Sequence, residues 1–223
     1  MSREFQFDTL IKVGGSISER GSHKQLRILG QELHEIYLQK KNFIILGGGG
    51  VFVEEIRQLQ KEICFSDEAA HWMAIYGMEQ YALLLQEIIP NSRLIDVYLL
   101  ESEETSLSAL PILKVFKFMK NSSTLEHTWN TTSDAIACEI ASYLKLKKIV
   151  FVKDVDGVLI NKKIVPEISV SQLNKLESSP LDPLTPNLLK KLDLEAIIIN
   201  GFNPSRIKDC LKDKKVIGTR IIR

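Results

Sequence analysis

Four short runs of apolar residues constrain the fold of this chain more than any other feature. The runs at residues 7–13, 43–46, 149–152 and 196–199 are mostly or wholly apolar, and segments with helical spacing separate them. Strands without alternation of apolar and polar residues are typical of parallel sheets that helices cover on both faces. The sequence therefore predicts an α/β protein with a mostly parallel central sheet.

Helices are expected between these strands and after them. Apolar residues at helical spacing predict a helix at residues 23–40 and a second at residues 51–61. A third, at residues 67–89, starts after Ser66 as a capping residue and stops at Pro90. Further expected elements are strands at 94–100 and 112–118, a small hairpin around 161–165, short helices at 169–176, 187–192 and 204–211, and a proline-rich loop at 178–186.

One segment directs a helix start and a strand end to the same place. Thr132 or Ser133 can cap a helix whose first turn carries Asp134. The third apolar run follows this helix and leads to Asp154 and Asp156 in a glycine turn. Open α/β sheets bind their ligands in the crevice beyond the carboxyl ends of the strands. The segment therefore predicts a ligand-binding crevice.

Two glycine loops suggest that this crevice accepts phosphate groups. The first strand ends in Gly14, Gly15 and Ser16, and the second runs into four glycines at residues 47–50. Glycine lets backbone N–H groups approach an anion, and a helix start adds a favourable dipole. Lys12, just before the first turn, can act as a point charge on a phosphoryl oxygen. Neither the P-loop pattern nor the dinucleotide-binding pattern Gly-x-Gly-x-x-Gly is present.

Composition excludes several classes of protein. The 223 residues are 44% hydrophobic and 26% charged, as in one ordinary globular domain spanning residues 1–223, and the net charge of +1 gives no case for nucleic acid or a membrane surface as partner. The first residues lack the apolar core of a signal peptide, and no apolar run approaches a membrane span, so a cytoplasmic protein is expected. The spacing of Cys64, Cys138 and Cys210 argues against disulfides and structural zinc, and Cys138 is expected in the core.

The ordered motifs resemble those of the amino acid kinase superfamily. They are Lys12-Val-Gly-Gly-Ser, the glycine turn at 47–50, Thr132-Ser133-Asp134, Asp154-Val-Asp-Gly157-Val158 and the closing Gly218-Thr219. The resemblance covers nearly the whole chain. It implies a three-layer αβα sandwich whose N-terminal half holds the phosphoryl acceptor and whose C-terminal half holds ATP.

A second resemblance concerns the acceptor. Ala70-His71-Trp72-Met73-Ala74-Ile75, Met78-Glu79-Gln80-Tyr81 and Asn200-Gly201 are similar to the aminomethylfuranylmethyl-phosphate kinases of methanofuran biosynthesis. That family uses ATP to convert a phosphate monoester into a diphosphate. The His-Gly-Gly-Gly-Ser-Phe-Gly-His type of segment found in isopentenyl phosphate kinases is missing from this chain. Isopentenyl phosphate is therefore a less favoured acceptor.

The resemblance implies a role for each motif in an ATP-dependent kinase that uses Mg²⁺. Phosphoryl transfer mainly requires in-line positioning and neutralisation of charge, and no metal-ligating side chain is assigned. Lys12 would bridge the transferred group, and Asp134 would hold that lysine in place. The expected nucleotide-binding residues are Gly14, Gly15, Ser16, Lys153, Asp154, Asp156 and Gly157, and the expected acceptor-binding residues are Gly48, Gly49, Gly50 and His71.

The chain also departs from the superfamily. Many members carry Gly-Gly-Met-x-x-Lys before the last helices, where this chain has Leu-Asp-Pro-Leu-Thr-Pro-Asn at residues 181–187. Lys153 stands where threonine or serine is common, and it can supply the missing positive charge. Leu159 occupies a position where an aromatic residue often flanks the nucleotide.

Several alternatives stay open at this point. His71 lies on an apolar helical stripe, so a packed core or interface histidine competes with a substrate ligand. Trp72, Tyr76 and Tyr81 suit either a subunit contact in a homo-oligomer or an acceptor pocket, with Glu79, Trp72 and Tyr81 as partners for an amine. His127 receives no role. A nucleotide-binding sensor or storage protein and a uridylate kinase-like enzyme are the rival functions.

Overall fold

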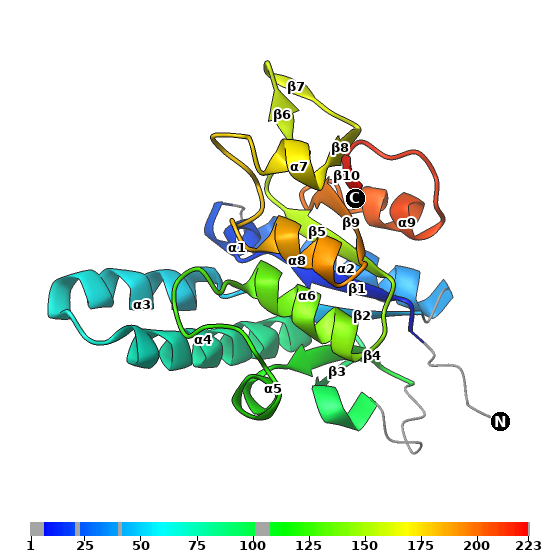
Figure 1. Ribbon diagram of the computed structural model, residues 1–223. Helices are drawn as coiled ribbons and strands as arrows, with labels where there is room; N and C mark the ends of the chain where they lie inside the picture. Colours follow the sequence, from blue (N-terminus) through cyan, green and yellow to red (C-terminus); the bar gives the residue numbers. More distant parts are fainter. Residues whose placement is uncertain (1–6, 21–22, 40–41, 101–107, 223) are drawn as a thin grey trace.

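The computed structural model describes residues 7–20, 23–39, 42–100 and 108–222. Its centre is a single large sheet between two layers of helices (Figure 1). The strands of this sheet are β1 (Thr9–Val13), β2 (Phe43–Gly47), β3 (Ser92–Asp96), β4 (Leu110–Lys114), β5 (Lys148–Lys153), β8 (Glu167–Ser169), β9 (Glu195–Asn200) and β10 (Thr219–Ile222). Their order across the sheet is β3-β4-β2-β1-β5-β9-β10-β8.

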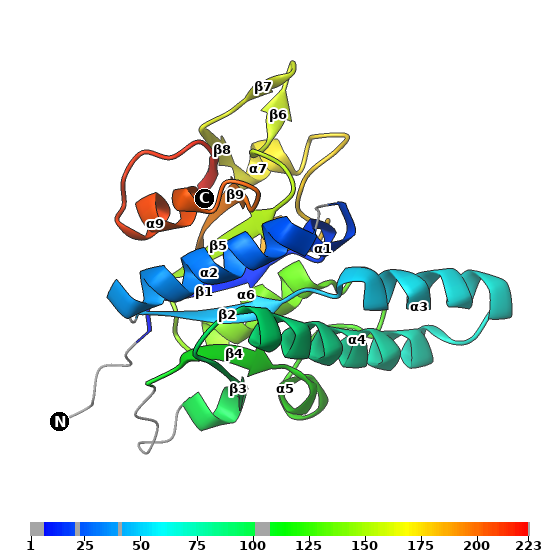
Figure 2. The same ribbon diagram turned by 180° about the vertical axis from the view of Figure 1, so that it is seen from behind.

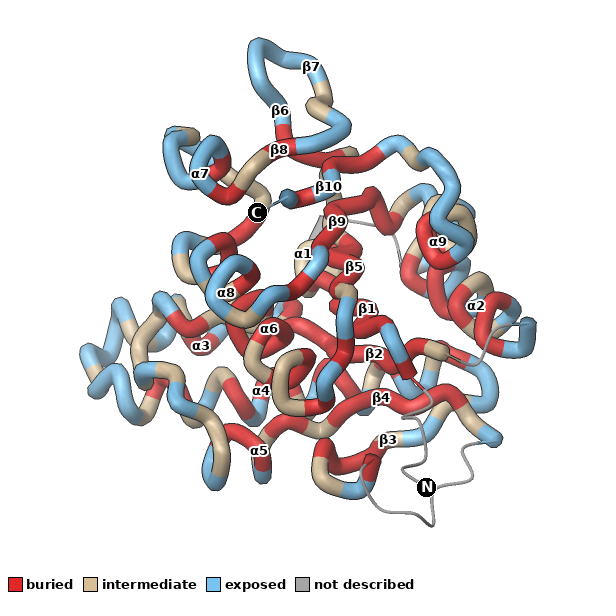
Figure 3. The backbone as a smooth tube through the Cα atoms, turned by 45° about the vertical axis from the view of Figure 1, so that its right-hand side comes forward, coloured by how far each residue is buried: buried red, intermediate tan, exposed pale blue. Residues whose placement is uncertain are grey.

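All pairings in this sheet are parallel except that between β9 and β10. The central strands β1 and β2 are buried along their whole length, and β5 is buried except at its two terminal lysines, as the apolar runs require (Figure 3). The remaining two strands, β6 (Leu159–Ile160) and β7 (Lys163–Ile164), form the small hairpin outside the sheet. The prediction of a mostly parallel αβα sandwich is therefore confirmed.

Helices on the two faces complete the layers. They are α1 (Ser16–Arg20), α2 (His23–Gln39), α3 (Gly50–Ile63), α4 (Asp67–Ile88), the 3₁₀ helix η1 (Val97–Leu100), α5 (Phe116–Asn121), α6 (Ser133–Tyr143), α7 (Val170–Leu173), α8 (Thr185–Lys191) and α9 (Ser205–Leu211). The helices α6 and α8 cover one face, whereas α2 and α4 cover the other (Figures 1 and 2). No helix among the described residues is long and apolar enough to cross a membrane.

The helices α3 and α4 pack against each other as a hairpin that projects beyond the sheet (Figure 2). Ser66 caps α4 as expected, because its side chain accepts a hydrogen bond from the Ala69 N–H. Asp67 and Glu68 in the first turn add charges that favour a helix N-terminus. The hairpin therefore places the start of α4 far from the strand ends and its middle close to them.

Two predicted strands were too long. Residues 97–100 form η1, and the segment from Phe116 onward turns into α5. The carboxylate of Glu79 causes the second difference, because its Oε1 accepts hydrogen bonds from the N–H groups of Val115 (2.6 Å) and Phe116 (2.9 Å). These bonds satisfy the first donors of the helix. Strand β8 was not predicted, and the helix end expected at Lys40 lies outside the described residues, as does the N-terminal segment 1–6.

Candidate active site

Three charged side chains meet at the carboxyl ends of two neighbouring strands. Lys12 on β1 lies opposite Phe151 on β5, and Lys153 follows Phe151 by two residues. Lys12 and Lys153 therefore lie at the carboxyl ends of neighbouring strands. Asp134 enters from the first turn of α6, and its Oδ1 lies 2.8 Å from Lys12 Nζ. Lys12 Nζ and Asp134 Oδ1 form an ion pair, and Lys153 Nζ donates a hydrogen bond to Asp134 Oδ2. One carboxylate therefore joins two ammonium groups.

This centre is almost closed to solvent. The side chains of Lys12 and Asp134 are each 4% exposed, and that of Lys153 is 15% exposed. Burial on its own raises the pKa of Asp134, but the charges of Lys12 and Lys153 outweigh burial and lower this pKa to about 2. Burial lowers the pKa of Lys12, and Asp134 opposes that shift. Asp134 is thus a permanent carboxylate that anchors two cations.

Asp182 is a second carboxylate beside the centre, and the sequence analysis assigned it no role. Thr132, the cap of α6, accepts a hydrogen bond from the Asp134 N–H and donates one to Asp182 Oδ2. Asp182 Oδ1 accepts hydrogen bonds from the N–H and hydroxyl of Thr185. Burial, followed by the charge of Asp134, raises the pKa of Asp182. The available sequence signal was an aspartate three residues before Thr185 at a helix start.

The two glycine loops touch each other next to these charges. A Cβ on Gly15 would lie 2.2 Å from the backbone nitrogen of Gly50, so only glycine permits this approach. The N–H of Gly14 donates to Val152 O at 2.8 Å, and that of Gly48 donates to Val13 O at 2.9 Å. The N–H groups of Gly14 and Gly48 are therefore already bonded within the fold. The prediction that they donate to phosphate has no support from these contacts and stays a prediction.

A cavity of about 930 Å³ has the residues of this centre in its wall. Its other lining residues fall into two groups, one on α3, α4 and the loop before α6, and one on the segment from Leu173 to Asn187; we call the parts of the cavity beside these two groups its branches. Of the residues predicted from sequence, those on its wall are Lys12, Gly14, Gly15, Ser16, Gly49, Gly50, His71, Asp134 and Lys153. The structure thus brings residues from five separate segments to one cavity.

Four predicted site residues lie off the cavity wall. Gly48 packs beneath the centre, where a Cβ would be 3.4 Å from Lys12 Nζ. Asp154 accepts a hydrogen bond from Ser16 Oγ at 3.0 Å, and Asp156 pairs with Arg206 and Asn200. Gly157 has a φ of 146° and packs on Thr219. These residues hold the loops around the cavity in place. Because none of them lines the cavity, the structure gives no support to the prediction that they bind a ligand.

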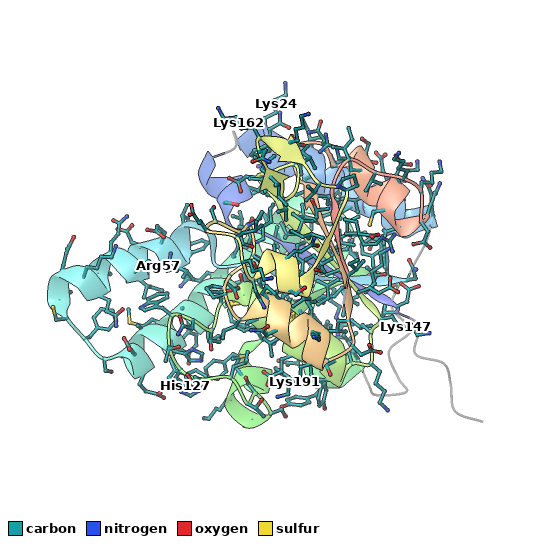
Figure 4. The ribbon with its side chains drawn as sticks, turned by 45° about the horizontal axis from the view of Figure 1, so that its top comes forward. Lys24, Arg57, His127, Lys147, Lys162 and Lys191 are labelled. Atoms are coloured by element: carbon teal, nitrogen blue, oxygen red, sulfur yellow. The ribbon has the colours of Figure 1, made fainter. Side chains whose placement is uncertain are left out.

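The far end of the α3–α4 branch contains residues that sequence reasoning missed. The Arg57 guanidinium lies 4.7 Å from the centre of the Trp129 ring, and the two side chains line the cavity together. His127 stacks on His71 with ring centres 4.2 Å apart. Figure 4 labels Arg57 on α3 and His127 near the same hairpin. Because these contacts join distant segments, no local pattern indicated them.

Three residues expected to hold an amine do not reach the cavity. Tyr81 is fully buried, and its hydroxyl donates to Gly14 O at 3.3 Å. Glu79 caps α5, as described above, and the Trp72 indole N–H donates to Glu68 at 2.7 Å. None of Trp72, Glu79 and Tyr81 is among the lining residues. The amine-binding role assigned to them is therefore wrong.

Comparison with known proteins assigns this chain to a family. The model of the amino acid kinase family matches residues 9–200, which include every strand of the sheet except β10. The chain belongs to the amino acid kinase family. This family membership and the kinase relatives make it a phosphotransferase of the kinase class.

Two full-length relatives have different acceptors in their names. The chain is 27% identical over 216 residues to the (5-(aminomethyl)furan-3-yl)methyl phosphate kinase of Methanocaldococcus jannaschii, covering 96% of this chain and 97% of the relative. It is 22% identical over 234 residues to a uridylate kinase of Methanococcoides burtonii, covering 95% and 96%. Both relatives are kinases, and their names give two different acceptors.

Solved structures confirm the fold. The uridylate kinase of Archaeoglobus fulgidus has a TM-score of 0.75 at 19% identity, covering 97% of this chain and 100% of that chain. The UMP kinase of Ureaplasma parvum has a TM-score of 0.72 at 17% identity, covering 98% and 100%. At this identity the likeness supports the fold and carries no information on the acceptor.

Proposed function

We propose that this amino acid kinase transfers the γ-phosphoryl group of ATP to a small phosphate monoester, giving a diphosphate and ADP. The observation that carries the proposal is the buried centre of Lys12, Asp134 and Lys153 at the junction of two cavity branches. Two ammonium groups share one carboxylate there. The excess positive charge suits a phosphoryl group in transfer.

The chemistry needs no protein base. An oxygen of the acceptor phosphate, already anionic at neutral pH, attacks the γ-phosphorus, and the bond from this phosphorus to the ADP oxygen breaks. Lys12 and Lys153 neutralise the charge that spreads over the transferred group. Asp134, with its pKa of about 2, takes no proton and fixes both lysines.

The branch beside α7 and α8 is our candidate for the nucleotide, and the α3–α4 branch for the acceptor. This division follows the prediction of one domain, residues 1–223, whose N-terminal half binds the acceptor and whose C-terminal half binds ATP. Among the described residues, no group of three or more His, Cys, Asp and Glu could hold a metal ion. Mg²⁺ would therefore be held mainly by phosphate oxygens and water, with Asp182 as the facing carboxylate, and it would supply further charge neutralisation.

For the acceptor we propose an aminomethylfuran methyl phosphate, as in methanofuran biosynthesis. The support is the 27% identity across 96% of the chain to the kinase named for that substrate. Uridine monophosphate is the competing acceptor, because the uridylate kinases also match over nearly the full length. The homo-oligomer and the cytoplasmic location stay predictions.

A coupled ADP-release assay tests the proposal. Purified protein with Mg²⁺ and ATP is offered (5-(aminomethyl)furan-3-yl)methyl phosphate, uridine monophosphate and acetylglutamate. We expect kcat/KM to be far higher for the furan phosphate, with the diphosphate identified by mass spectrometry. Equal or better efficiency with uridine monophosphate overturns the acceptor. ATP binding without turnover of any phosphate ester supports the sensor or storage alternative.

A further inference from the structure

One buried polar atom on the cavity wall has no partner within the described residues. His71 is 6% exposed, and its Nε2 lies fully buried without a hydrogen bond. His71 nevertheless lines the cavity, in the branch between α3 and α4. An unpaired buried nitrogen costs free energy unless a ligand completes its hydrogen bonding. This unpaired nitrogen, in a side chain that lines the cavity, makes His71 a candidate contact for whatever occupies this branch.

The surroundings of His71 keep its ring neutral. Its face stacks on His127, with the ring planes inclined by 13°. His127 Nδ1 in turn lies 2.6 Å from Glu68 Oε2. Burial lowers the pKa of His71, the charge of His127 lowers it further, and Glu68 opposes both. A neutral imidazole can accept a hydrogen bond at Nε2, whereas an imidazolium cannot.

The other charges in this branch come from α3 and α4. Asp67 and Glu54 supply two carboxylates, and Arg57 supplies one guanidinium. Glu54 pairs with Arg57 at 3.0 Å, while Asp67 accepts a bond from the Gln60 amide at 2.9 Å. With His71 neutral, the carboxylates on this wall outnumber the cations. The wall therefore favours a positively charged ligand group.

We propose that the α3–α4 end of the cavity is a subsite for an ammonium group of the acceptor, with His71 Nε2 as a hydrogen-bond acceptor and Asp67 as a nearby counter-charge. This assignment rests on the proposed function and adds the location of the second polar end of the substrate. It replaces Trp72, Glu79 and Tyr81, which lie off the cavity wall.

The length of the branch fits a small substrate. Gly50 and Arg57 both line the cavity and are seven residues apart on α3, which is about 10 Å at the helical rise. Val53, Ile75 and Met78 line the wall between them. An apolar stretch between two polar ends suits a single ring that carries a phosphate on one side and an amine on the other.

The test compares two substrates that differ in one nitrogen. Wild-type protein is assayed with (5-(aminomethyl)furan-3-yl)methyl phosphate and with the analogue in which methyl replaces aminomethyl. We expect kcat/KM to be about ten- to hundredfold lower for the analogue, the size of a hydrogen bond to a charged group. His71→Phe, which keeps a ring against His127, should remove this preference, and His71→Gln should restore part of it.

Controls separate the subsite from the kinase reaction. Asp67→Asn should weaken the preference for the amine, whereas His34→Gln on α2, outside the cavity lining, should leave it unchanged. Turnover of both substrates with equal efficiency would uphold the proposed kinase and overturn the subsite. If neither substrate is bound or turned over, both proposals fail.

The pH dependence gives a second readout with a defined sign. Below the ordinary histidine pKa near 6.5, His71 gains a proton and repels an ammonium group, so the preference for the amine should fall as the pH is lowered. Both substrates share the titration of the phosphate, and the ratio of their kcat/KM values removes it. A preference that grows as the pH falls would assign His71 to an anion and overturn the proposal.

Discussion

Replacing Asp134 with asparagine tests the centre of the proposed mechanism. The change keeps the shape of the side chain and removes the one negative charge between Lys12 and Lys153. The lowering of the Asp134 pKa from 3.8 to about 2 corresponds to about 2–3 kcal/mol in favour of the folded, charged form. Because the folded pKa is the lower one, this stabilisation is present above pH 3.8 and is lost as the pH falls through about 2.

Asp134→Asn should therefore unfold about 5–10 °C below the wild type, since 1 kcal/mol moves the Tm of a chain of this size by about 2–4 °C. Without the carboxylate the two lysines lose their fixed positions, and kcat should fall about a hundred- to a thousandfold, with a smaller change in ATP affinity. Asp156→Asn is the matched control, because that carboxylate is 43% exposed and pairs with Arg206. It should cost less than about 1 kcal/mol.

The assays are thermal unfolding, ATP binding by calorimetry and the coupled ADP-release rate as a function of pH. In the asparagine variant the repulsion between Lys12 and Lys153 loses the compensation by Asp134, so the pKa of Lys12 falls further and the residual kcat should rise more steeply than the wild-type kcat as the pH is lowered. An asparagine variant that shows the expected loss of Tm and keeps the wild-type kcat would refute the anchoring role. Asp134 would then be a first-turn acid that only stabilises α6.

Three further substitutions probe the site separately. Lys12→Ala should reduce kcat by orders of magnitude in the ADP-release assay while circular dichroism stays unchanged, and an unchanged turnover would remove Lys12 from the mechanism. Lys153→Met keeps the apolar stem and should lower kcat at least tenfold, whereas Lys148→Met on the same strand, at the opposite end, should not. Gly15→Ala forces a Cβ to 2.2 Å from a backbone atom of Gly50, so it should lower the Tm and raise the KM for ATP together; wild-type values of both would contradict the close approach of the two loops.

The sequence predicted the parts of the fold that depend on local pattern. The central strands are runs of apolar residues, and their burial on both faces leaves only a parallel sheet with helical cover. The limit of the strand near residue 116 depends instead on Glu79, which accepts hydrogen bonds from N–H groups 36 and 37 residues further along. Strand β8 is short and exists because β10 pairs with it. Such ends are determined by tertiary contacts that a single sequence does not display.

The same distinction applies to the candidate site. Lys12 and Asp134 were predicted because Lys12 lies near the end of a strand and Asp134 near the start of a helix, and both boundaries have a recognisable sequence pattern. Arg57, His127 and Asp182 were missed because their partners, Trp129, His71 and Thr132, lie between 50 and 72 residues away. A related case is the lysine of the Gly-Gly-Met-x-x-Lys segment, which this chain lacks at residues 181–187. Lys153 reaches Asp134 from the end of β5, a contact visible only once the two chain segments are placed together.

The projecting helical hairpin has a consequence for how this enzyme could acquire new substrates. The reacting groups sit on strand ends inside the sheet, whereas Arg57, Asp67 and His71 sit on α3 and α4, beyond the sheet edge. Mutations at the projecting end of the hairpin, away from buried α4 residues such as Tyr81, can therefore accumulate without disturbing the packing on which phosphoryl transfer depends. Gene duplication followed by drift in this one segment offers a route from one phosphorylated metabolite to another. A chimaera that exchanges only residues 50–88 between two such kinases would carry the substrate choice with the exchanged piece.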